Sequence, residues 1–331
     1  MSELMRAVGY RKNLPVSDPS SLLDLEIPVP DPGRHDLVVR VRAVSVNPVD
    51  VKVRAGSDPQ GEPKILGYDA AGVVERVGPA VTLFRPGDEV WYAGSIARPG
   101  TNAELHLVDE RIAGPKPASL DFAEAAALPL TTLTAWEALF DQLRLGQQST
   151  GTLLVLGAAG GVGSIAVQLA RQLTDLEVIG TASRPESRQY VLERGAHRVV
   201  DHRDDLAENL ADGVDYILTP HSAGMVPAFA RMLRPFGAVV AIDEPAGLDI
   251  SPLKSKSISW HWELMFTRAL YDPTSTAQHE ILRQAAELVD KGTLHTTLTE
   301  RIDGIDAANL RRAHATVETG STIGKIVLAG F

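Results

Sequence analysis

The sequence predicts an α/β protein with two lobes, one mostly antiparallel β and the other built on a doubly wound parallel sheet. The chain has 331 residues, which is more than a single hydrophobic core usually accommodates. Its first third consists of short apolar runs between dense turn residues, as in antiparallel β domains. From Thr152 the chain alternates buried strands with amphipathic helices, which indicates a parallel sheet covered by helices.

The first lobe is predicted from its strands and from the turns between them. Residues 37–46 alternate apolar and polar side chains, as expected of a half-buried strand. Residues 72–77 and 89–92 are further β-like runs, separated by Val-Gly-Pro and Arg-Pro-Gly-Asp turn signals. A compact, mostly antiparallel β domain is therefore expected.

The second lobe is predicted from a change in texture near Asp121. Residues 121–128 are rich in alanine and helical in propensity, and residues 134–145 continue in that style. Residues 162–173 carry apolar side chains at the spacing of one helix face. A repeated strand–helix series of this kind indicates a doubly wound sheet. The strands are predicted at residues 153–156, 177–181, 198–201, 214–219 and 238–242.

The end of the chain is expected to return to the first lobe. A helix is predicted at residues 279–291, and the β-like segment at 322–328 is similar in style to the first third. The predicted domains are therefore 1–124 together with 270–331 for the β lobe, and 125–269 for the cofactor lobe.

The composition excludes several classes of function. The formal net charge is −10 and no basic stripe is present, which argues against nucleic acid and membrane surfaces as partners. No apolar stretch approaches the roughly 18 residues of a membrane helix. The first residues lack the layout of a signal peptide, so a cytoplasmic protein is expected. The chain has no cysteine, which excludes disulfides, thiolate nucleophiles, iron–sulfur clusters and cysteine-ligated zinc.

A glycine-rich turn between a buried strand and a helix predicts a dinucleotide site. Gly160 lets the backbone approach a pyrophosphate, Gly163 lets the helix pack close to the strand, and the helix N-terminus offers free N–H groups. A structural turn is the alternative, but the strand before and the helix after favour cofactor binding. The candidate residues are Gly157, Ala158, Ala159, Gly160, Gly161, Val162 and Gly163.

The end of the second strand predicts which dinucleotide binds. An NAD site needs a carboxylate about 20 residues beyond the fingerprint, where it holds the ribose 2′-hydroxyl. This strand tip instead carries Ser183 and Arg184, a hydroxyl donor and a permanent cation that suit a 2′-phosphate. Arg188, one helical turn further on, adds a second charge. A solvated helix start is the alternative interpretation, and NADPH is the expected cofactor.

Several motifs follow one another along nearly the whole chain. They are Ala-Val-Ser-Val-Asn-Pro-Val-Asp at 43–50, Gly-Tyr-Asp-Ala-Ala-Gly at 67–72, Pro-Gly-Asp-Glu-Val at 86–90, Leu-Thr-Ala-Trp at 133–136 and the glycine-rich turn. Together they resemble the medium-chain dehydrogenase/reductase superfamily. The stretches 91–94 and 259–266 are similar to its quinone oxidoreductase branch, in the group called zinc-type alcohol dehydrogenase-like. The resemblance implies a GroES-like catalytic domain, a Rossmann cofactor domain and a homodimer. The strand near His261 and Glu263 is then expected at the subunit contact or in the lining of a pocket.

The residues at the zinc-ligand positions conflict with the name of this group. By position, the resemblance places Asn47 at the first cysteine, Tyr68 at the histidine and Leu130 near the second cysteine. An amide, a phenol and an aliphatic side chain do not form a tetrahedral nitrogen and sulfur site for zinc. The loop with four cysteines that holds structural zinc is also missing. No metal site is therefore expected.

Without zinc as a Lewis acid, conjugated acceptors are easier substrates than alcohols. Hydride addition to an enone or a quinone places negative charge on a remote oxygen, which hydrogen-bond donors stabilise. Asn47 and Tyr68 are the candidate catalytic donors. The alternatives are an Asn-Pro turn for Asn47 and a core aromatic for Tyr68. Asp50 and Asp69 are expected to be structural.

Four further residues are candidate cofactor contacts. Thr134 matches a segment that lies beside the nicotinamide in relatives, although a helix cap is the alternative. His221 and Ile242 follow the fourth and fifth strand tips, where Rossmann ligands lie. The resemblance places Lys325 at a lysine that reaches a cofactor phosphate or ribose, with a surface lysine as the alternative.

The expected function is transfer of hydride from NADPH to a quinone or an α,β-unsaturated carbonyl, without zinc. An alcohol dehydrogenase or an enoyl-thioester reductase of the same superfamily is the alternative, but a thioester carrier predicts a basic rim that the sequence lacks. A non-catalytic NADPH-binding protein is the alternative from another class, and it predicts a damaged cofactor loop or a basic face. Some relatives carry a polysaccharide lyase label, against which the intact dinucleotide loop argues.

Overall fold

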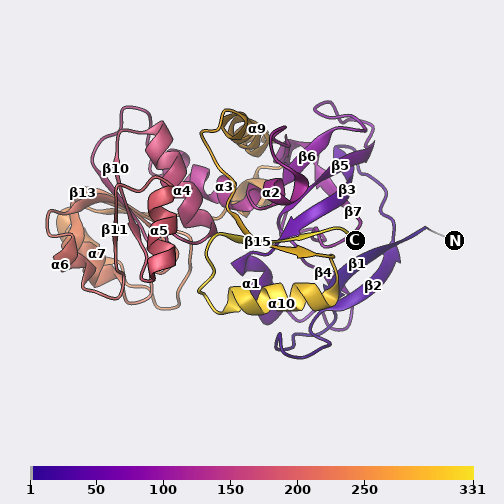
Figure 1. Cartoon of the computed structure of the whole chain (residues 1–331), viewed down its shortest axis with the longest axis horizontal. Coiled ribbons are helices and arrows are strands. Elements are labelled where there is room, and N and C mark those ends of the chain that lie inside the picture. Colours follow the sequence, from indigo (N-terminus) through magenta and orange to yellow (C-terminus); the bar gives the residue numbers. More distant parts are fainter. Residues whose placement is uncertain (1–2) are drawn as a thin grey trace. The chain divides into compact units, whose positions relative to one another are not determined.

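The computed structural model describes residues 3–331, which form two compact units (Figure 1). The first unit comprises the described residues up to Leu130 together with Phe266–Phe331, and the second comprises Thr131–Met265. The chain therefore leaves the first unit and re-enters it after completing the second.

The first unit is a mostly antiparallel β domain. One sheet has the strand order β15-β16-β3-β5-β6-β8, with β7 also paired to β3, and a smaller sheet has the order β2-β1-β4. Its helices are α1 (Pro48–Gly56), α2 (Phe122–Ala126), α8 (Phe266–Tyr271), α9 (Ala277–Asp290) and α10 (Ala307–Glu318). Its strands are β1 (Leu4–Tyr10), β2 (Leu23–Pro28), β3 (Asp36–Ser45), β4 (Lys64–Ile65), β5 (Ala70–Val77), β6 (Glu89–Tyr92), β7 (Leu105–Asp109), β8 (Ala113–Pro115), β15 (Leu298–Asp303) and β16 (Lys325–Ala329).

The C-terminal strand β16 completes the N-terminal sheet. It pairs antiparallel with β3, so that Val327 lies opposite Ser45 and Leu328 opposite Val44. In Figure 1 the yellow C-terminal elements accordingly lie among the purple strands of this unit. The pairing places residues from the two ends of the sequence at one sheet position, which the candidate site described below uses.

Strand β3 has one face buried along its length and the other buried only in part, which fits the half-buried strand expected from its alternating pattern. Leu37 and Val39 pack into the main core of the unit, whereas Val38 packs into a second cluster with Met5 and Leu105. The smaller sheet therefore covers the second face of β3 at Val38, whereas Arg40 and Arg42, further along the strand, stay partly exposed and exposed, respectively.

The second unit is a doubly wound parallel sheet. Its strands have the order β11-β10-β9-β12-β13-β14, and each described neighbouring pair is parallel. Helix α3 (Pro129–Trp136) leads into the unit and continues as a π-helical segment, Glu137–Gln142. The strands are β9 (Thr152–Val155), β10 (Glu177–Thr181), β11 (Arg198–Val200), β12 (Val214–Thr219), β13 (Leu233–Ala241) and β14 (Ser259–Trp262), and the helices are α4 (Gly161–Leu173), α5 (Pro185–Glu193), α6 (Leu206–Asn209) and α7 (Val226–Met232).

The core of the second unit lies between this sheet and its helices. Leu154 and Ile179 from central strands pack with Phe229 from α7, and all three are fully buried. Strand β13 begins earlier than expected, because a bulge opposite β12 absorbs the Arg-Pro-Phe-Gly interruption. Among the described residues, no helix has the length and apolar character to span a membrane.

Candidate active site

A buried polar network in the first unit contains both candidate catalytic residues. Asn47 lies between the end of β3 and the start of α1, and Tyr68 lies two residues before the start of β5. Lys325 is the first residue of β16. Because β3 pairs with both β5 and β16, the sheet brings these three segments together.

Asp50 fixes the backbone around this network, which is the structural role expected of it. Its carboxylate accepts hydrogen bonds from the N–H of Asn47 at 2.8 Å and from the N–H of Gly67 at 2.9 Å. Burial raises the pKa of Asp50 to about 7, although both hydrogen bonds and the nearby Lys325 ammonium lower it. Gly67 has φ +111°, and a Cβ there would lie 2.4 Å from Thr101 Oγ1, so this position requires glycine.

Asp69 is the centre of the network and contacts four hydrogen-bond donors. Its Oδ2 accepts from Ser45 Oγ at 2.7 Å, from Asn47 Nδ2 at 2.7 Å and from Lys325 Nζ at 3.3 Å. Its Oδ1 accepts from the N–H of Leu130 at 2.7 Å. Burial raises the pKa of Asp69, whereas the Lys325 ammonium and these hydrogen bonds lower it.

Lys325 is fully inside the first unit and is not a surface lysine. Its Nζ donates to Asn47 Oδ1 at 2.5 Å, to the carbonyl of Val46 at 3.0 Å and to Asp69. Burial lowers the pKa of Lys325, and the nearby carboxylates of Asp69 and Asp50 raise it. Its contact with a cofactor phosphate or ribose stays a prediction.

Asn47 and Tyr68 differ in what their polar atoms contact. Asn47 Oδ1 accepts from Lys325, and its Nδ2 donates to Asp69 and, at 3.4 Å, to the carbonyl of Tyr68. The Tyr68 hydroxyl forms no hydrogen bond with any residue that the structure describes. Its buried ring packs edge-on against Phe266, with ring centroids 5.3 Å apart. Burial, with the Asp50 charge, raises the pKa of Tyr68, so the phenol remains an O–H donor at neutral pH.

The residues at the zinc-ligand positions do not fit a zinc ion. The Asn47 oxygen faces the ammonium of Lys325, where a metal would need an empty coordination position. Leu130 reaches the network through its backbone N–H, which is a donor and not a ligand. Across residues 3–331, no group of three or more His, Cys, Asp or Glu side chains has an arrangement that holds a metal ion.

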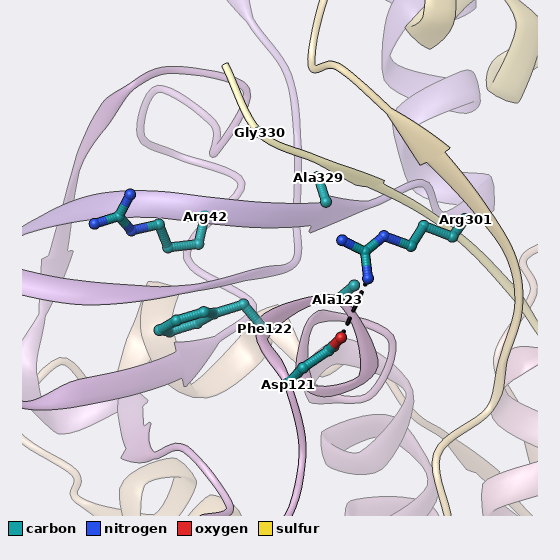
Figure 2. A pocket seen from close by; sticks show the side chains of 7 residues that line it. All are labelled: Arg42, Asp121, Phe122, Ala123, Arg301, Ala329 and Gly330. Carbon is teal, nitrogen blue, oxygen red and sulfur yellow. Dashed lines mark hydrogen bonds and ion pairs between the residues drawn. The ribbon is translucent and has the colours of Figure 1, made fainter.

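A shallow pocket of about 290 Å³ lies elsewhere in the first unit (Figure 2). Arg42, Phe122 and Arg301 line it, and Arg301 forms an ion pair with Asp121 at 3.2 Å. None of the residues predicted to bind substrate or cofactor lines this pocket. We therefore do not include it in the candidate site.

The glycine-rich turn of the second unit fits a dinucleotide. Gly157 has φ +62°, and Gly160 is the N-cap of α4. A Cβ at Gly163 would lie 2.4 Å from the carbonyl oxygen of Gly157 and 2.7 Å from Cα of Ala158. The helix therefore approaches the strand more closely than any side chain allows, which leaves the backbone of residues 157–163 as the surface for phosphates.

Other predicted cofactor residues gather at the carboxyl ends of neighbouring strands in this unit. The N–H of Gly157 donates to Thr181 Oγ1 of β10 at 3.0 Å. The N–H of His221 donates to Thr219 Oγ1, and that of Ile242 to the Thr219 carbonyl, both at 3.0 Å. Ligands of doubly wound sheets bind outside these strand ends. Thr134 is buried inside α3 and not at a helix start, so a capping role does not explain it.

The three residues predicted to hold a 2′-phosphate have different surroundings. Arg184 is exposed at the N-cap of α5, next to the partly exposed Ser183. Arg188 donates to the carbonyls of Ala182 at 3.3 Å and Val199 at 3.0 Å, so it ties β10 to β11.

Arg203 is a cation at this strand tip that the sequence reasoning missed. Its Nη2 donates to the Ser183 carbonyl at 2.8 Å and forms an ion pair with Asp201 at 2.6 Å. The signal lay in strand order, because Arg203 follows β11 and β11 pairs with β10. Asp201 also brings a carboxylate to this tip, which reading along β10 alone did not show.

Comparisons with known proteins identify relatives of this chain. Residues 33–118 match the alcohol dehydrogenase GroES-like domain, and residues 194–328 match the zinc-binding dehydrogenase family. A zinc-type alcohol dehydrogenase-like protein of Staphylococcus epidermidis is 36% identical over 335 residues, which are 98% of this chain and 99% of that protein. The chain belongs to the medium-chain dehydrogenase/reductase superfamily.

Other members of the medium-chain dehydrogenase/reductase superfamily extend the likeness. The quinone oxidoreductase of Rattus norvegicus is 34% identical over 238 residues, which are 70% of this chain and 71% of that protein. The structure described as a "putative zinc-dependent alcohol dehydrogenase protein" from Rhizobium etli CFN 42 has a TM-score of 0.96 at 53% identity, covering 100% of this chain and 99% of that one. The quinone oxidoreductase from Coxiella burnetii has a TM-score of 0.85 at 27% identity, covering 99% and 100%. The chain is thus an oxidoreductase of a superfamily that binds nicotinamide cofactors, with the expected GroES-like and Rossmann domains.

Proposed function

We propose that this protein reduces a quinone or an α,β-unsaturated carbonyl with NADPH and uses no catalytic zinc. The observation that carries the proposal is the pair of side chains at the zinc-ligand positions. The Asn47 oxygen is bound to the Lys325 ammonium, and Tyr68 presents a phenol. Alcohol oxidation needs a group that stabilises an alkoxide, whereas a conjugated acceptor needs a hydrogen-bond donor at its carbonyl oxygen.

NADPH supplies the hydride when bound, and the residues of the chain bind the acceptor and polarise its carbonyl group. Tyr68 is the proposed donor to the acceptor oxygen, where negative charge develops. Its hydroxyl has no acceptor among the described residues, and its raised pKa keeps the proton in place. Asn47 is the second predicted donor, and its hydrogen bonds are considered below.

The preference for NADPH rests on the cations around Ser183. Arg184 is exposed beside it, and Arg203 is held against its carbonyl. Guanidinium groups bind phosphate through paired, charge-assisted hydrogen bonds. Arg184 directly follows Ser183 and is exposed at the strand tip, so it is the proposed principal contact of the 2′-phosphate.

A homodimer is part of the proposal. Strand β14 is the last strand in its sheet, and Trp262 and Leu264 are 50% and 53% exposed there. Unpaired strand edges with apolar side chains are suited to pairing with another chain. A second copy of this strand is the proposed occupant. Nucleic acid and membranes are not proposed as partners, because the chain is acidic.

The proposal is tested with a panel of quinones, enals and saturated alcohols, by following the absorbance of the nicotinamide. We expect quinones or enals to consume NADPH and to do so more slowly with NADH. Oxidation of saturated alcohols without turnover of any conjugated acceptor contradicts the proposal. Equal rates with both cofactors contradict only its NADPH part.

A further inference from the structure

We propose that Lys325 and Asp69 are positioning residues, which turn the Asn47 amide inward and leave Tyr68 as the donor to the acceptor carbonyl. This inference rests on the proposed function. It assigns Asn47 and Lys325 a different task from direct contact with substrate or cofactor.

The hydrogen-bond inventory fixes the charges of the pair. All contacts of the Asp69 carboxylate are with donors, namely Ser45 Oγ, Asn47 Nδ2, the N–H of Leu130 and Lys325 Nζ. A protonated Asp69 carboxyl would carry an O–H that has no acceptor among these donors. Asp69 is therefore ionised. Lys325 in turn meets three acceptors, which matches the three hydrogens of an ammonium.

The charged pair then fixes the direction of the Asn47 amide. The Lys325 ammonium lies 2.5 Å from one end of the amide, which must therefore be the acceptor Oδ1. The Asp69 carboxylate lies 2.7 Å from the other end, which must be the donor Nδ2. The second hydrogen of Nδ2 points to the carbonyl of Tyr68 at 3.4 Å. The polar atoms of Asn47 are therefore engaged within the protein, which makes it a positioning residue.

The same groups hold the backbone on both sides of Tyr68. The N–H of Gly67 donates to Asp50, and the carbonyl of Tyr68 lies at Asn47 Nδ2. The carbonyl of Asp69 accepts from Thr101 Oγ1 at 3.0 Å. The position of the Tyr68 hydroxyl thus depends on a hydrogen-bond network that Lys325 and Asp69 complete. Displacement of a catalytic group by about 1 Å can lower the rate about 100-fold.

Lys325→Met tests this inference, with Lys116→Met as the matched control. Lys116 is an equally buried lysine of the same unit, held by Glu89 and the carbonyls of Pro117 and Leu120. We expect Lys325→Met to lower kcat with a quinone on the order of 100-fold while the Kd for NADPH, from fluorescence titration, stays unchanged. Lys325→Arg should recover part of kcat, and the control should leave both quantities unchanged.

Because Lys325→Met leaves a buried carboxylate unpaired, the double variant Lys325→Met/Asp69→Asn removes both charges. It should fold and show the same loss of kcat. In a double-mutant cycle that combines Lys325→Met with Tyr68→Phe, the losses of kcat should be strongly non-additive, because both changes act through the Tyr68 hydroxyl.

Several results would overturn the inference. One is a raised Kd for NADPH in Lys325→Met with kcat intact at saturating NADPH, which indicates that Lys325 contacts the cofactor. The others are additive losses of kcat in the cycle with Tyr68→Phe, and a normal kcat in the double variant Lys325→Met/Asp69→Asn. A wild-type protein that reduces none of the acceptors contradicts the proposed function instead, and the inference falls with it.

Discussion

A hydroxyl without a protein acceptor separates Tyr68 from the other polar side chains of its network. Asn47 stands beside it in the same frame, but its amide is held by Lys325 and Asp69. Sequence motifs identified both residues as donors and did not distinguish them. The distinction depends on Lys325, which the chain places far from Asn47 in sequence and which only sheet pairing brings close.

At the end of β10, we expect Arg184→Ala to lower the preference for NADPH over NADH on the order of tenfold or more. The reason is that a charge-assisted hydrogen bond to the 2′-phosphate contributes about 1.5–3 kcal/mol. The comparison is kcat/KM with each cofactor. Arg171→Ala, an exposed arginine on α4 of the same unit, is the control and should keep the wild-type ratio. An unchanged ratio in Arg184→Ala refutes the assignment of this residue.

Strand β14 and the π-helical segment Glu137–Gln142 meet at a buried acidic pair. Glu263 and Glu137 are 6% and 4% exposed. Burial and the neighbouring Glu137 carboxyl raise the pKa of Glu263 to about 9, while Gln142 lowers it through a hydrogen bond. Residue propensities predicted a helix through residues 134–145, but not its π-helical register. The pairing of two carboxyls across elements is not visible in a linear pattern.

The stability of the second unit should consequently depend on pH. Glu263 binds its proton more tightly in the folded state, so the free energy of unfolding is highest below the unfolded pKa and falls as the pH rises toward about 9. Urea denaturation at about pH 6 and about pH 9 measures this difference. Glu263→Gln should reduce the difference, and the exposed Glu186→Gln should not. If Glu263→Gln and wild type lose the same stability between the two pH values, the raised pKa of Glu263 does not cause the loss.

For the whole molecule, sequence patterns predicted the doubly wound sheet, because five of its strands are legible on their own and alternate with helices. The return of the C-terminal strand to the first unit was expected because residues 322–328 resemble the β-like runs of the first third. The pairing of β16 with β3 and its register are seen only in the structure. Burial of Val38 on the second face of β3 was not expected, because the smaller sheet that covers it is assembled from separate segments. Long-range packing of this kind leaves no local signature.

The proposed dimer gives a prediction about the assembly. Trp262→Asp places a charge in the exposed edge of β14, and we expect it to convert dimers to monomers in light scattering coupled to gel filtration. Phe236→Asp is the control, because Phe236 is 84% exposed in the same unit but does not lie on that strand. If wild type and Trp262→Asp have the same mass, β14 is not the subunit contact.

The central claim is that a Tyr68-based site reduces a conjugated acceptor with NADPH and without zinc. The most direct test is the rate of quinone-dependent NADPH oxidation by protein dialysed against a chelator, measured before and after zinc is added back. Because the Asn47 oxygen is occupied by Lys325, we expect the same rate in both cases. Loss of activity on chelation and its recovery with stoichiometric zinc would contradict the account.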